Sequence, residues 1–480
     1  MRDRRGFRIR AFKRTYDRVA GKFSFNISYE THTKITPRSL VVAEAFGLGI
    51  DEAQKFKVLD AELKIGPQDI VYITGDSGSG KSVLLRAIRA DLGEEAIDLS
   101  EVQVDPDKPL IETIGSTVEE GLELLSRVGL NDAFLFLRLY SQLSDGQKYR
   151  YRIAKLIESK KQWWLMDEFA ACLDRDTAKI ISFNLQKIAR SHGKAVIVAT
   201  THSDLVEDLS PSVLVNKRFG EEINIQYRGD RAFQCSLLRE MKVEVGSRED
   251  WQKLCSFHYR GHKTSVVRKI FRLTRGMELC GVIVYTYPPP ACFGRRMVLP
   301  RMSMHEINQQ LSTINRVVIH PKYRTVGLGA KLIRESLPLV GTDFVELIAV
   351  MAKYSPFAEK AGMKRISQQT EVKSVVKISQ KLSSLGFDVQ LLGSQHYVKQ
   401  KLDTLTTQQL CSVRGVLLKN PQPRLKKEVT SSRHMPYGIT ADYVKYVEAA
   451  DSEKLAKLIK TVALLLQTKV YLFWSCQTIS

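Results

Sequence analysis

Short apolar runs alternate with helical patterns along the first half of the chain. The run Ile70–Thr74 has the length and apolar character of a buried strand, and so does Ala195–Ala199. Alternating apolar residues over Lys22–Tyr29 predict a half-buried strand instead, and helical spacing is clear over Val118–Val128. These patterns predict an α/β domain over residues 23–225. Further strands are expected at residues 58–65 and 163–168, and a helix at residues 176–191.

A glycine-rich turn joins the strand at Ile70–Thr74 to a helical pattern. Residues 75–82 fit the motif G-x-x-x-x-G-K-[ST] in its required context, between a strand and a helix. Glycines let backbone N–H groups turn inward around phosphate oxygens, and a helix N-terminus adds partial positive charge. We therefore predict a P-loop in which Lys81 reaches the β- and γ-phosphates of a nucleoside triphosphate and the Ser82 hydroxyl holds Mg²⁺. The predicted phosphate-binding residues are Gly75, Asp76, Ser77, Gly78, Ser79, Gly80, Lys81 and Ser82.

Three more motifs follow the P-loop. Leu143–Gln147 reads L-S-D-G-Q and runs directly into a helical pattern. The strand at Trp163–Glu168 ends in two acids, and Thr200–His202 closes the next strand. In this order the motifs resemble those of the nucleotide-binding domain of ABC ATPases, over about residues 20–220. One departure is Asp145, which stands at a glycine position of the family's L-S-G-G-Q signature.

The resemblance implies ATP and Mg²⁺ as cofactors and gives these residues roles. Asp167 would position Mg²⁺ together with Ser82, and Gln103, as the Q-loop glutamine, is expected at both the metal and the nucleotide. Glu168 would polarise the attacking water as general base. His202 would contact the γ-phosphate and stabilise the transition state. The other nucleotide contacts that the resemblance implies come from Ser144, Gly146 and Gln147 of the signature, from Asp174 of the D-loop, and from Phe56 as the candidate aromatic residue that stacks on adenine.

The chain has a single P-loop and a single signature motif. In ABC ATPases the signature motif completes the nucleotide site of the opposite protomer. The resemblance therefore implies an ATP-dependent homodimer in which two ATPase domains meet head to tail and form two composite sites.

From about residue 241 the pattern changes to that of a second domain, predicted over residues 238–370. A strand at Asn315–Ile319, a glycine-bearing turn and a helix over Lys331–Leu339 lie at its centre. The turn reads R-x-x-G-x-G over Arg324–Gly329, so this run resembles motif A of the GNAT acyltransferases. We therefore expect a mixed α/β, GNAT-like domain. Its other predicted elements are strands at residues 242–245, 269–273, 280–287 and 344–351 and a helix at residues 248–257.

The GNAT resemblance implies acetyl-CoA as a third cofactor. Backbone N–H groups at the start of the helix would cradle the pyrophosphate of acetyl-CoA. The strand end at Arg316–Ile319 would splay from its neighbour and pair with the pantetheine arm. A degenerate, purely structural GNAT domain is the alternative. The expected acetyl-CoA contacts are Val318, Ile319, Arg324, Thr325, Val326, Gly327, Leu328, Gly329 and Ala330.

The acid and the base of acyl transfer are harder to assign. Many GNAT enzymes place a tyrosine, which protonates the CoA thiolate, where this chain has Ala358. Tyr354 is the nearest candidate acid, and a buried tyrosine with a purely structural hydroxyl is the alternative. His258, in a cluster of His, Tyr and Arg side chains after a helix, is the candidate base. This cluster resembles that of nucleobase-modifying GNAT relatives of the Mom type, and an ordinary basic loop is the alternative.

Charge and cysteine content narrow the choice of partners. The chain of 480 residues has a formal net charge of +21, which favours a polyanion such as DNA or RNA. Residues 1–22 are predicted to be a basic arm, either phosphate-binding or merely solvated, and residues 371–480 a basic extension with a helix at Ser452–Leu466. The seven cysteines show no metal-ligand spacing, and no run of 18 apolar residues occurs. We therefore expect a cytoplasmic, soluble protein and no membrane partner.

The leading hypothesis is acetyl-CoA-dependent acyl transfer to a nucleic acid, most simply to a base, with closure of the ATPase dimer presenting the target. A base in a duplex must leave the stack before its exocyclic nitrogen is reached, and ATP-gated closure would help to supply that work. One alternative is an ATP-switched clamp for nucleic acid with a non-catalytic GNAT domain. Another is acetylation of a protein or a small amine. The ATPase subunit of a separate transporter ranks last, because it leaves the fused second domain unexplained.

Overall fold

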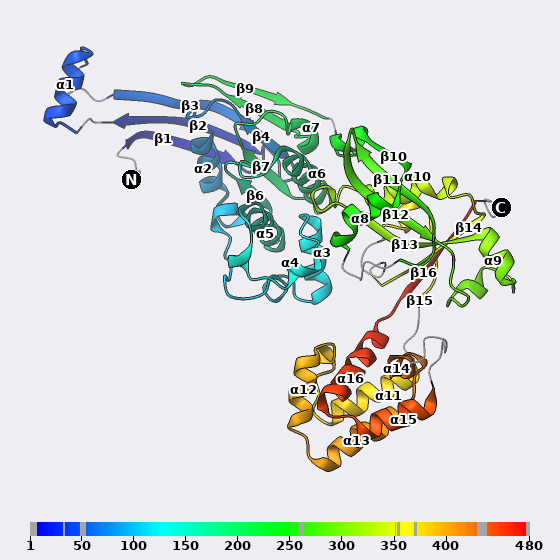
Figure 1. Cartoon of the computed structure of the whole chain (residues 1–480). Coiled ribbons are helices and arrows are strands. Elements are labelled where there is room, and N and C mark those ends of the chain that lie inside the picture. The colour runs from blue at the N-terminus through cyan, green and yellow to red at the C-terminus, as the bar shows by residue number, and fades with distance from the viewer. Residues whose placement is uncertain are drawn as a thin grey trace. The chain divides into compact units, whose positions relative to one another are not determined.

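The computed structural model describes residues 7–31, 34–48, 54–229, 231–258, 264–350, 352, 356–368, 372–429 and 439–476 (Figure 1). The chain divides into two compact units. The first contains residues 1–285 and 315–339, and the second contains residues 286–314 and 340–480. Each unit is described by itself.

A six-stranded sheet in the order β5-β6-β7-β4-β8-β9 forms the centre of the first unit. Its strands are parallel from β5 to β8, and the edge strand β9 is antiparallel. On β4, Ile70 and Tyr72 join one apolar cluster, whereas Val71 and Ile73 join another. Burial on both faces explains why this strand is a continuous apolar run. The strands span Ala96–Asp98 (β5), Trp163–Met166 (β6), Ala195–Ala199 (β7), Ile70–Thr74 (β4), Val213–Lys217 (β8) and Ile223–Tyr227 (β9).

Helices cover both faces of this sheet. Helix α2 packs in the cluster that contains Val71 and Ile73, together with apolar side chains of β2 and β3. Helices α3, α5 and α6 pack in the cluster of Ile70 and Tyr72. The helices span Lys81–Leu92 (α2), Val118–Arg127 (α3), Ala133–Phe136 (α4), Asp145–Glu158 (α5), Arg175–Ser191 (α6) and Val206–Leu209 (α7).

A three-stranded antiparallel sheet, β1-β2-β3, carries the N-terminal end of the chain. The residues predicted to be a basic arm are in large part the edge strand β1, because apolar Phe7, Ile9 and Ala11 alternate with arginines at strand spacing. In the same strand, Arg14 Nε lies 3.0 Å from Asp91 Oδ1 on α2, so this arginine binds the protein itself. The elements span Phe7–Asp17 (β1), Lys22–Thr31 (β2), Pro37–Ala45 (α1) and Gln54–Lys64 (β3).

A further set of strands has the hydrogen-bonded order β10-β11-β12 in the first unit and β13-β14-β16-β15 in the second unit. In the first unit, β10 is antiparallel to β11. In the second unit, β13 is parallel to β14 over Leu311–Ile314, and β16 is antiparallel to both β14 and β15. The stretch Arg316–Ile319, predicted to splay, lies beyond the part of β13 that pairs with β14. The elements span Met241–Val245 (β10), Arg248–Leu254 (α8), Val267–Arg275 (β11), Glu278–Thr286 (β12), Met304–Gln310 (α9), Leu311–Ile319 (β13), Leu328–Ser336 (α10), Phe344–Ala349 (β14), Lys364–Gln368 (β15) and Val470–Ser475 (β16).

A group of helices is inserted between β15 and β16, and Figure 1 shows them packed on one another. They share an apolar cluster of their own, which includes Leu382, Leu417 and Ile459. The predicted helix at Ser452–Leu466 is confirmed as α16. In the described residues, no helix has both the length and the apolar character needed to cross a membrane. The others span Lys373–Ser384 (α11), Gln395–Asp403 (α12), Thr407–Lys419 (α13), Pro423–Val429 (α14) and Thr440–Ala449 (α15).

Candidate nucleotide-binding site

The predicted P-loop lies between the end of β4 at Thr74 and the start of α2 at Lys81. Two of its glycines have no room for a side chain. A β-carbon on Gly75 would collide with the carbonyl oxygen of Lys217, and one on Gly80 would lie 2.7 Å from Val58 Cγ1. Both glycines also have positive φ, at 137° and 99°, which favours glycine. The loop is therefore packed closely against Lys217 and Val58.

Two polar side chains of the loop suit a bound polyphosphate. Lys81 Nζ donates to the carbonyl oxygens of Gly75 at 2.8 Å and Asp76 at 2.6 Å. Burial lowers the pKa of Lys81, and the negative charges of Asp167 and Asp76 oppose this effect. Ser79 Oγ is buried without a hydrogen-bond partner. A phosphate oxygen would satisfy this orphaned hydroxyl, so the loop fits the triphosphate that its sequence predicts.

The other predicted catalytic residues lie at the same edge of the sheet. Asp167 and Glu168 follow β6, and His202 follows β7 by three residues. Because β6, β7 and β4 are adjacent and parallel, their carboxyl ends bring these residues to the P-loop. Glu168 is exposed and has φ 50°, an uncommon conformation that is found often at functional sites.

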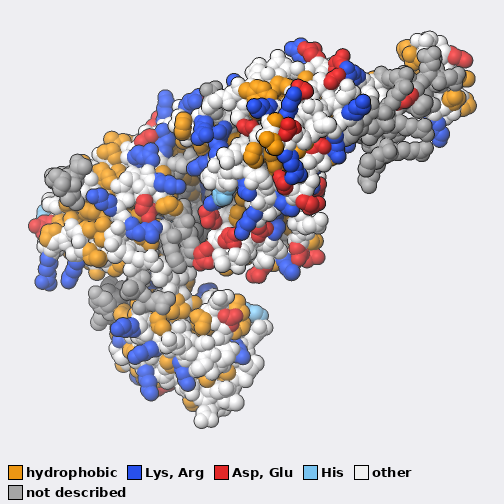
Figure 2. Space-filling model, turned by 180° about the vertical axis from the view of Figure 1, so that it is seen from behind, with side chains coloured by type: hydrophobic (Ala, Val, Ile, Leu, Met, Phe, Trp, Pro, Cys, Tyr) orange, Lys and Arg blue, Asp and Glu red, His pale blue; other side chains and the backbone are white. Residues whose placement is uncertain are grey.

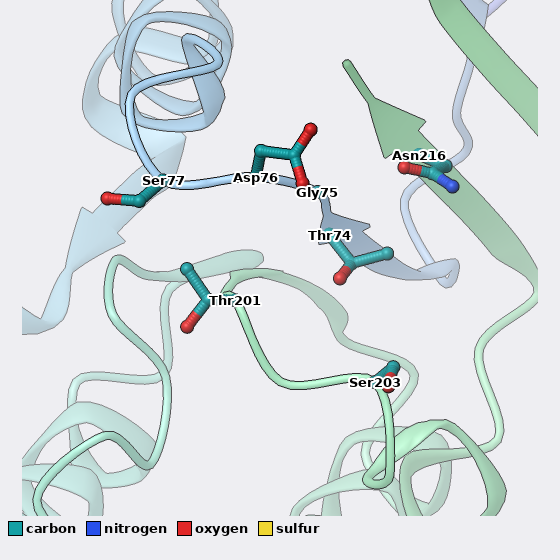
Figure 3. Close-up of a pocket in the computed structure, with 7 residues that line it drawn as sticks. All are labelled: Thr74, Gly75, Asp76, Ser77, Thr201, Ser203 and Asn216. Atoms are coloured by element: carbon teal, nitrogen blue, oxygen red, sulfur yellow. The ribbon is translucent and has the colours of Figure 1, made fainter. Parts of the chain in front are cut away.

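A cavity of about 640 Å³ opens at this edge (Figure 3). In Figure 3, Thr201 and Ser203, on the loop after β7, face Gly75 and Asp76. Hydrogen bonds join this loop to β4, because the His202 carbonyl accepts from Tyr72 Oη at 2.6 Å and from Thr74 Oγ1 at 3.4 Å. The cavity is lined by Thr74, Gly75, Asp76, Ser77, Thr201, Ser203 and Asn216.

The signature residues begin helix α5. The Ser144 side chain accepts a hydrogen bond from Gln147 N at 3.4 Å, and the Gln147 side chain accepts one from Ser144 N at 3.1 Å. This reciprocal capping explains the serine and the glutamine at this spacing. Gly146 lies against Leu173, where a β-carbon would be 3.2 Å from Cδ2. Within the described residues, the Ser144 side chain has a hydrogen bond only to its own capping partner, and Gln103 is exposed in the loop after β5.

Comparisons with known proteins agree with this geometry. The family model described as ABC transporter matches residues 58–171, which include the P-loop, the signature and the pair Asp167 and Glu168. The N-terminal part of the chain is an ABC-type ATPase domain. The match ends at residue 171 and covers under half of the chain, so it leaves the elements from α6 onward unassigned.

The curated relatives are, by their names, ATP-binding proteins of import systems. The methionine import ATP-binding protein MetN of Rhizobium etli is 30% identical over 230 residues, which cover 39% of this chain and 63% of the relative. The phosphonates import ATP-binding protein PhnC 1 of Cupriavidus metallidurans is 28% identical over 204 residues, covering 32% of this chain and 71% of the relative. The chain spans between half and about two thirds of the length of the first three relatives.

Solved structures were also compared. A dimeric structure of MJ0796, a bacterial ABC transporter cassette, has a TM-score of 0.31 and 22% identity, over 37% of this chain and 94% of that chain. The structure of cbiO1 from Clostridium perfringens, part of the ABC transporter complex cbiONQ, has a TM-score of 0.30 and 19% identity, over 36% of this chain and 82% of that chain.

The D-loop of the ABC-type domain caps helix α6. Asp174 accepts hydrogen bonds from Thr177 N at 3.2 Å and Thr177 Oγ1 at 2.6 Å. The next residue, Arg175, forms an ion pair with Asp204, which lies on the loop after β7. The D-loop is thus fixed beside the loop that carries His202.

The second glycine-rich loop begins helix α10. Gly327 is exposed, has φ 91°, and a β-carbon there would meet no atom within 4 Å. Arg324 turns the other way, and its guanidinium donates to the carbonyl oxygens of Ile319 at 2.9 Å, Asn131 at 3.2 Å and Phe257 at 3.3 Å. Arg324 therefore supports the loop, and the open face lies over Gly327.

The remaining residues predicted at this loop are in part buried. Asn184 Nδ2 on α6 donates to Thr325 Oγ1 at 2.6 Å, and Thr325 has φ 80°, which is unusual for a β-branched residue. The side chains of Val318, Val326, Leu328 and Ala330 belong to the core, so these residues can offer only backbone groups to a ligand.

The candidate acid and base of acyl transfer are Tyr354 and His258. The His258 ring lies edge-on to Trp251, with ring centroids 6.4 Å apart. Tyr354 lies outside the described residues. Ala358 is fully buried.

Proposed function

We propose that this chain hydrolyses ATP with Mg²⁺, at composite sites that two copies form head to tail. The convergence of the P-loop, the pair Asp167 and Glu168, and His202 at the carboxyl ends of adjacent parallel strands carries this proposal.

The residues divide the work of hydrolysis. The P-loop amides and Lys81 would hold the phosphates, and Ser82 and Asp167 would hold Mg²⁺, which would neutralise charge that builds on the γ-phosphate. Glu168 accepts a proton from water as the water oxygen attacks the γ-phosphorus. The bond from that phosphorus to the oxygen it shares with the β-phosphate breaks, and ADP leaves. His202 contacts the γ-phosphate and orients it.

The need for a second copy rests on Ser144. This residue is exposed at the N-terminus of α5, a helix of 14 residues whose partial positive charge would attract a phosphate group. In a head-to-tail pair, ATP bound to the P-loop of the other protomer would place its γ-phosphate beside Ser144. The test is sedimentation of the Glu168→Gln variant with saturating ATP and Mg²⁺, where a dimer is expected. A monomer under these conditions would contradict the composite site, and Lys81→Ala, which should not bind ATP, is the monomeric control.

A second candidate function, acetyl-CoA-dependent acyl transfer, is favoured by one observation. The Arg316–Ile319 end of β13 lies beyond the stretch that pairs with β14 and leads toward the exposed, left-handed Gly327 at the start of α10. Backbone groups of that strand end and of the helix start would then bind the pantetheine and the pyrophosphate. Calorimetric titration with acetyl-CoA tests this, and Gly327→Asp should abolish the binding.

The acceptor is proposed to be a nucleic acid because of the net charge of +21. Figure 2 shows lysine and arginine side chains spread over the face in view, with acidic side chains among them. Transfer of radiolabelled acetyl groups to DNA, tRNA or protein separates a nucleic-acid acceptor from a protein acceptor. Binding of acetyl-CoA without transfer to any acceptor would favour the clamp, and a co-purifying permease would favour the import role that the relatives' names state.

A further inference from the structure

The turn between β8 and β9 holds an exposed aromatic ring beside the P-loop. Phe219 is 64% exposed. Its Cε1 atom lies 3.8 Å from the position that a β-carbon on Gly78 would take, and no other described atom outside the adjoining residues comes within 4 Å of that position. The ring therefore borders an otherwise open face of the P-loop.

A buried lysine holds this turn. Lys217 is 0% exposed, and its Nζ donates to the carbonyl oxygens of Arg218, at 2.6 Å, and Gly220. A lysine is rarely buried unless its donors are paired. Because the two carbonyls lie on either side of Phe219, Lys217 fixes the backbone that carries the ring. Single exposed aromatic side chains are common on protein surfaces. Phe219 differs from an ordinary exposed ring because the buried Lys217 fixes the backbone on both sides of it.

An ion pair also ties the turn to the neighbouring sheet. Lys57 Nζ on β3 lies 2.6 Å from Glu221 Oε2, two residues after the ring. Val58, the next residue of β3, packs against Gly80 of the P-loop. The turn, β3 and the P-loop are therefore held together as one framework.

The order of the strands places this ring at the base end of a bound nucleotide. Asp167 and His202 follow β6 and β7, which lie on one side of β4, whereas Phe219 follows β8 on the other side. Adjacent strands are about 4.8 Å apart, so β7 and β8 are separated by about 10 Å. A triphosphate that directs its γ-phosphate toward Asp167 therefore directs its ribose and base toward β8.

We propose that Phe219 stacks on the base of the bound nucleotide and that Lys217 is the positioning residue for this ring. The inference rests on the proposed ATP site. Stacking recognises the π-face that all bases share, so the site should bind nucleoside triphosphates with weak preference among bases. Phe56 on β3, which is 46% exposed, is the rival assigned from sequence.

The test compares ATP with inorganic tripolyphosphate, which has phosphates but no base. Calorimetry uses the full chain carrying Glu168→Gln, so that hydrolysis does not interfere. Phe219→Ala should weaken ATP binding by between about 5-fold and 100-fold and leave tripolyphosphate binding unchanged. Phe219→Trp should bind ATP about as tightly as the parent. Lys81→Ala should weaken the binding of both ATP and tripolyphosphate.

Phe233→Ala is the matched control, because it removes another exposed phenyl ring, and it should bind ATP as its parent does. Unchanged ATP binding in Phe219→Ala, or an equal loss of tripolyphosphate binding, overturns the inference. Lys217→Met should reproduce the Phe219→Ala pattern, and a folded Lys217→Met protein with the parent's ATP affinity contradicts the positioning role. A parent that binds neither ligand would contradict the ATP site itself.

Discussion

A carboxylate oxygen of Asp176 lies 2.6 Å from the ammonium nitrogen of Lys322. Asp176 is in the first turn of α6, and Lys322 is in the turn before the second glycine-rich loop. Arg275 joins the same carboxyl group at 2.8 Å. Because Asp174 of the D-loop caps α6, this ion pair links the D-loop helix to the candidate acetyl-CoA loop within one compact unit.

Loss of this ion pair should cost stability. Lys322→Met leaves the largely buried Asp176 carboxylate with fewer donors, so the free energy of unfolding should fall by about 1–3 kcal/mol. Urea denaturation followed by fluorescence measures the change. Lys399→Met, which removes an exposed ion pair with Asp403, is the control and should change stability by less than about 0.5 kcal/mol. Equal effects of the two substitutions would contradict this account.

The same carboxyl group predicts how stability depends on pH. Burial raises the pKa of Asp176, but hydrogen bonds from Lys322 and Arg275 outweigh burial and hold the pKa below its ordinary value of 3.8. A lowered pKa in the folded state stabilises the protein above the unfolded pKa, and this contribution is lost as pH falls through the folded pKa. The thermal midpoint should therefore fall more steeply below pH 3.8 in the parent than in Asp176→Asn. Parallel curves for the two proteins would show that Asp176 has no such role.

The close packing of Gly75 against Lys217 predicts that one added methyl group at Gly75 weakens ATP binding. Gly75→Ala would force its β-carbon against the Lys217 carbonyl at a φ that alanine disfavours. The strain of about 1–3 kcal/mol should displace the loop and weaken ATP binding by at least about tenfold. Gly229→Ala is the control, because no atom lies within 4 Å of the added carbon and its φ is not positive. Calorimetric ATP affinities equal in both variants would disprove the clash.

The composite site predicts complementation between two inactive variants. Lys81→Ala removes the P-loop lysine, and Ser144→Arg blocks the signature, so each homodimer should lack ATPase activity. In an equal mixture, half of the dimers are mixed and one of their two sites is intact, so activity should recover to about a quarter of the parent's. If each chain completed its own site, mixing would restore no activity.

The sequence predicted the elements whose pattern is local. Strands β4 and β7 and helix α16 begin and end at the predicted residues, because continuous apolar runs and helical spacing specify them without help from distant residues. Strand β16 was not predicted. It exists because it pairs with β14 and β15, which precede it by more than a hundred residues. Strand β1 was hidden by its arginines, which indicated a solvated arm.

The candidate site was predictable for a related reason. The residues of the P-loop, Asp167, Glu168 and His202 lie in short motifs that directly follow strands, so the parallel sheet brings them together. Lys217 and Phe219 were missed because Lys217–Gly220 resembles an ordinary hairpin turn. The available signal was an aromatic residue, Phe219, in a turn position where polar residues and glycine prevail.

Steady-state ATP hydrolysis by the full chain and by its Glu168→Gln variant tests the central claim most directly. The parent should release phosphate in the presence of Mg²⁺, and Glu168→Gln should lower kcat by about 100-fold to 10,000-fold while ATP still binds, because the general base is lost and the phosphate contacts remain. A parent without Mg²⁺-dependent turnover, or a Glu168→Gln variant that hydrolyses ATP at the parent's rate, would contradict the account.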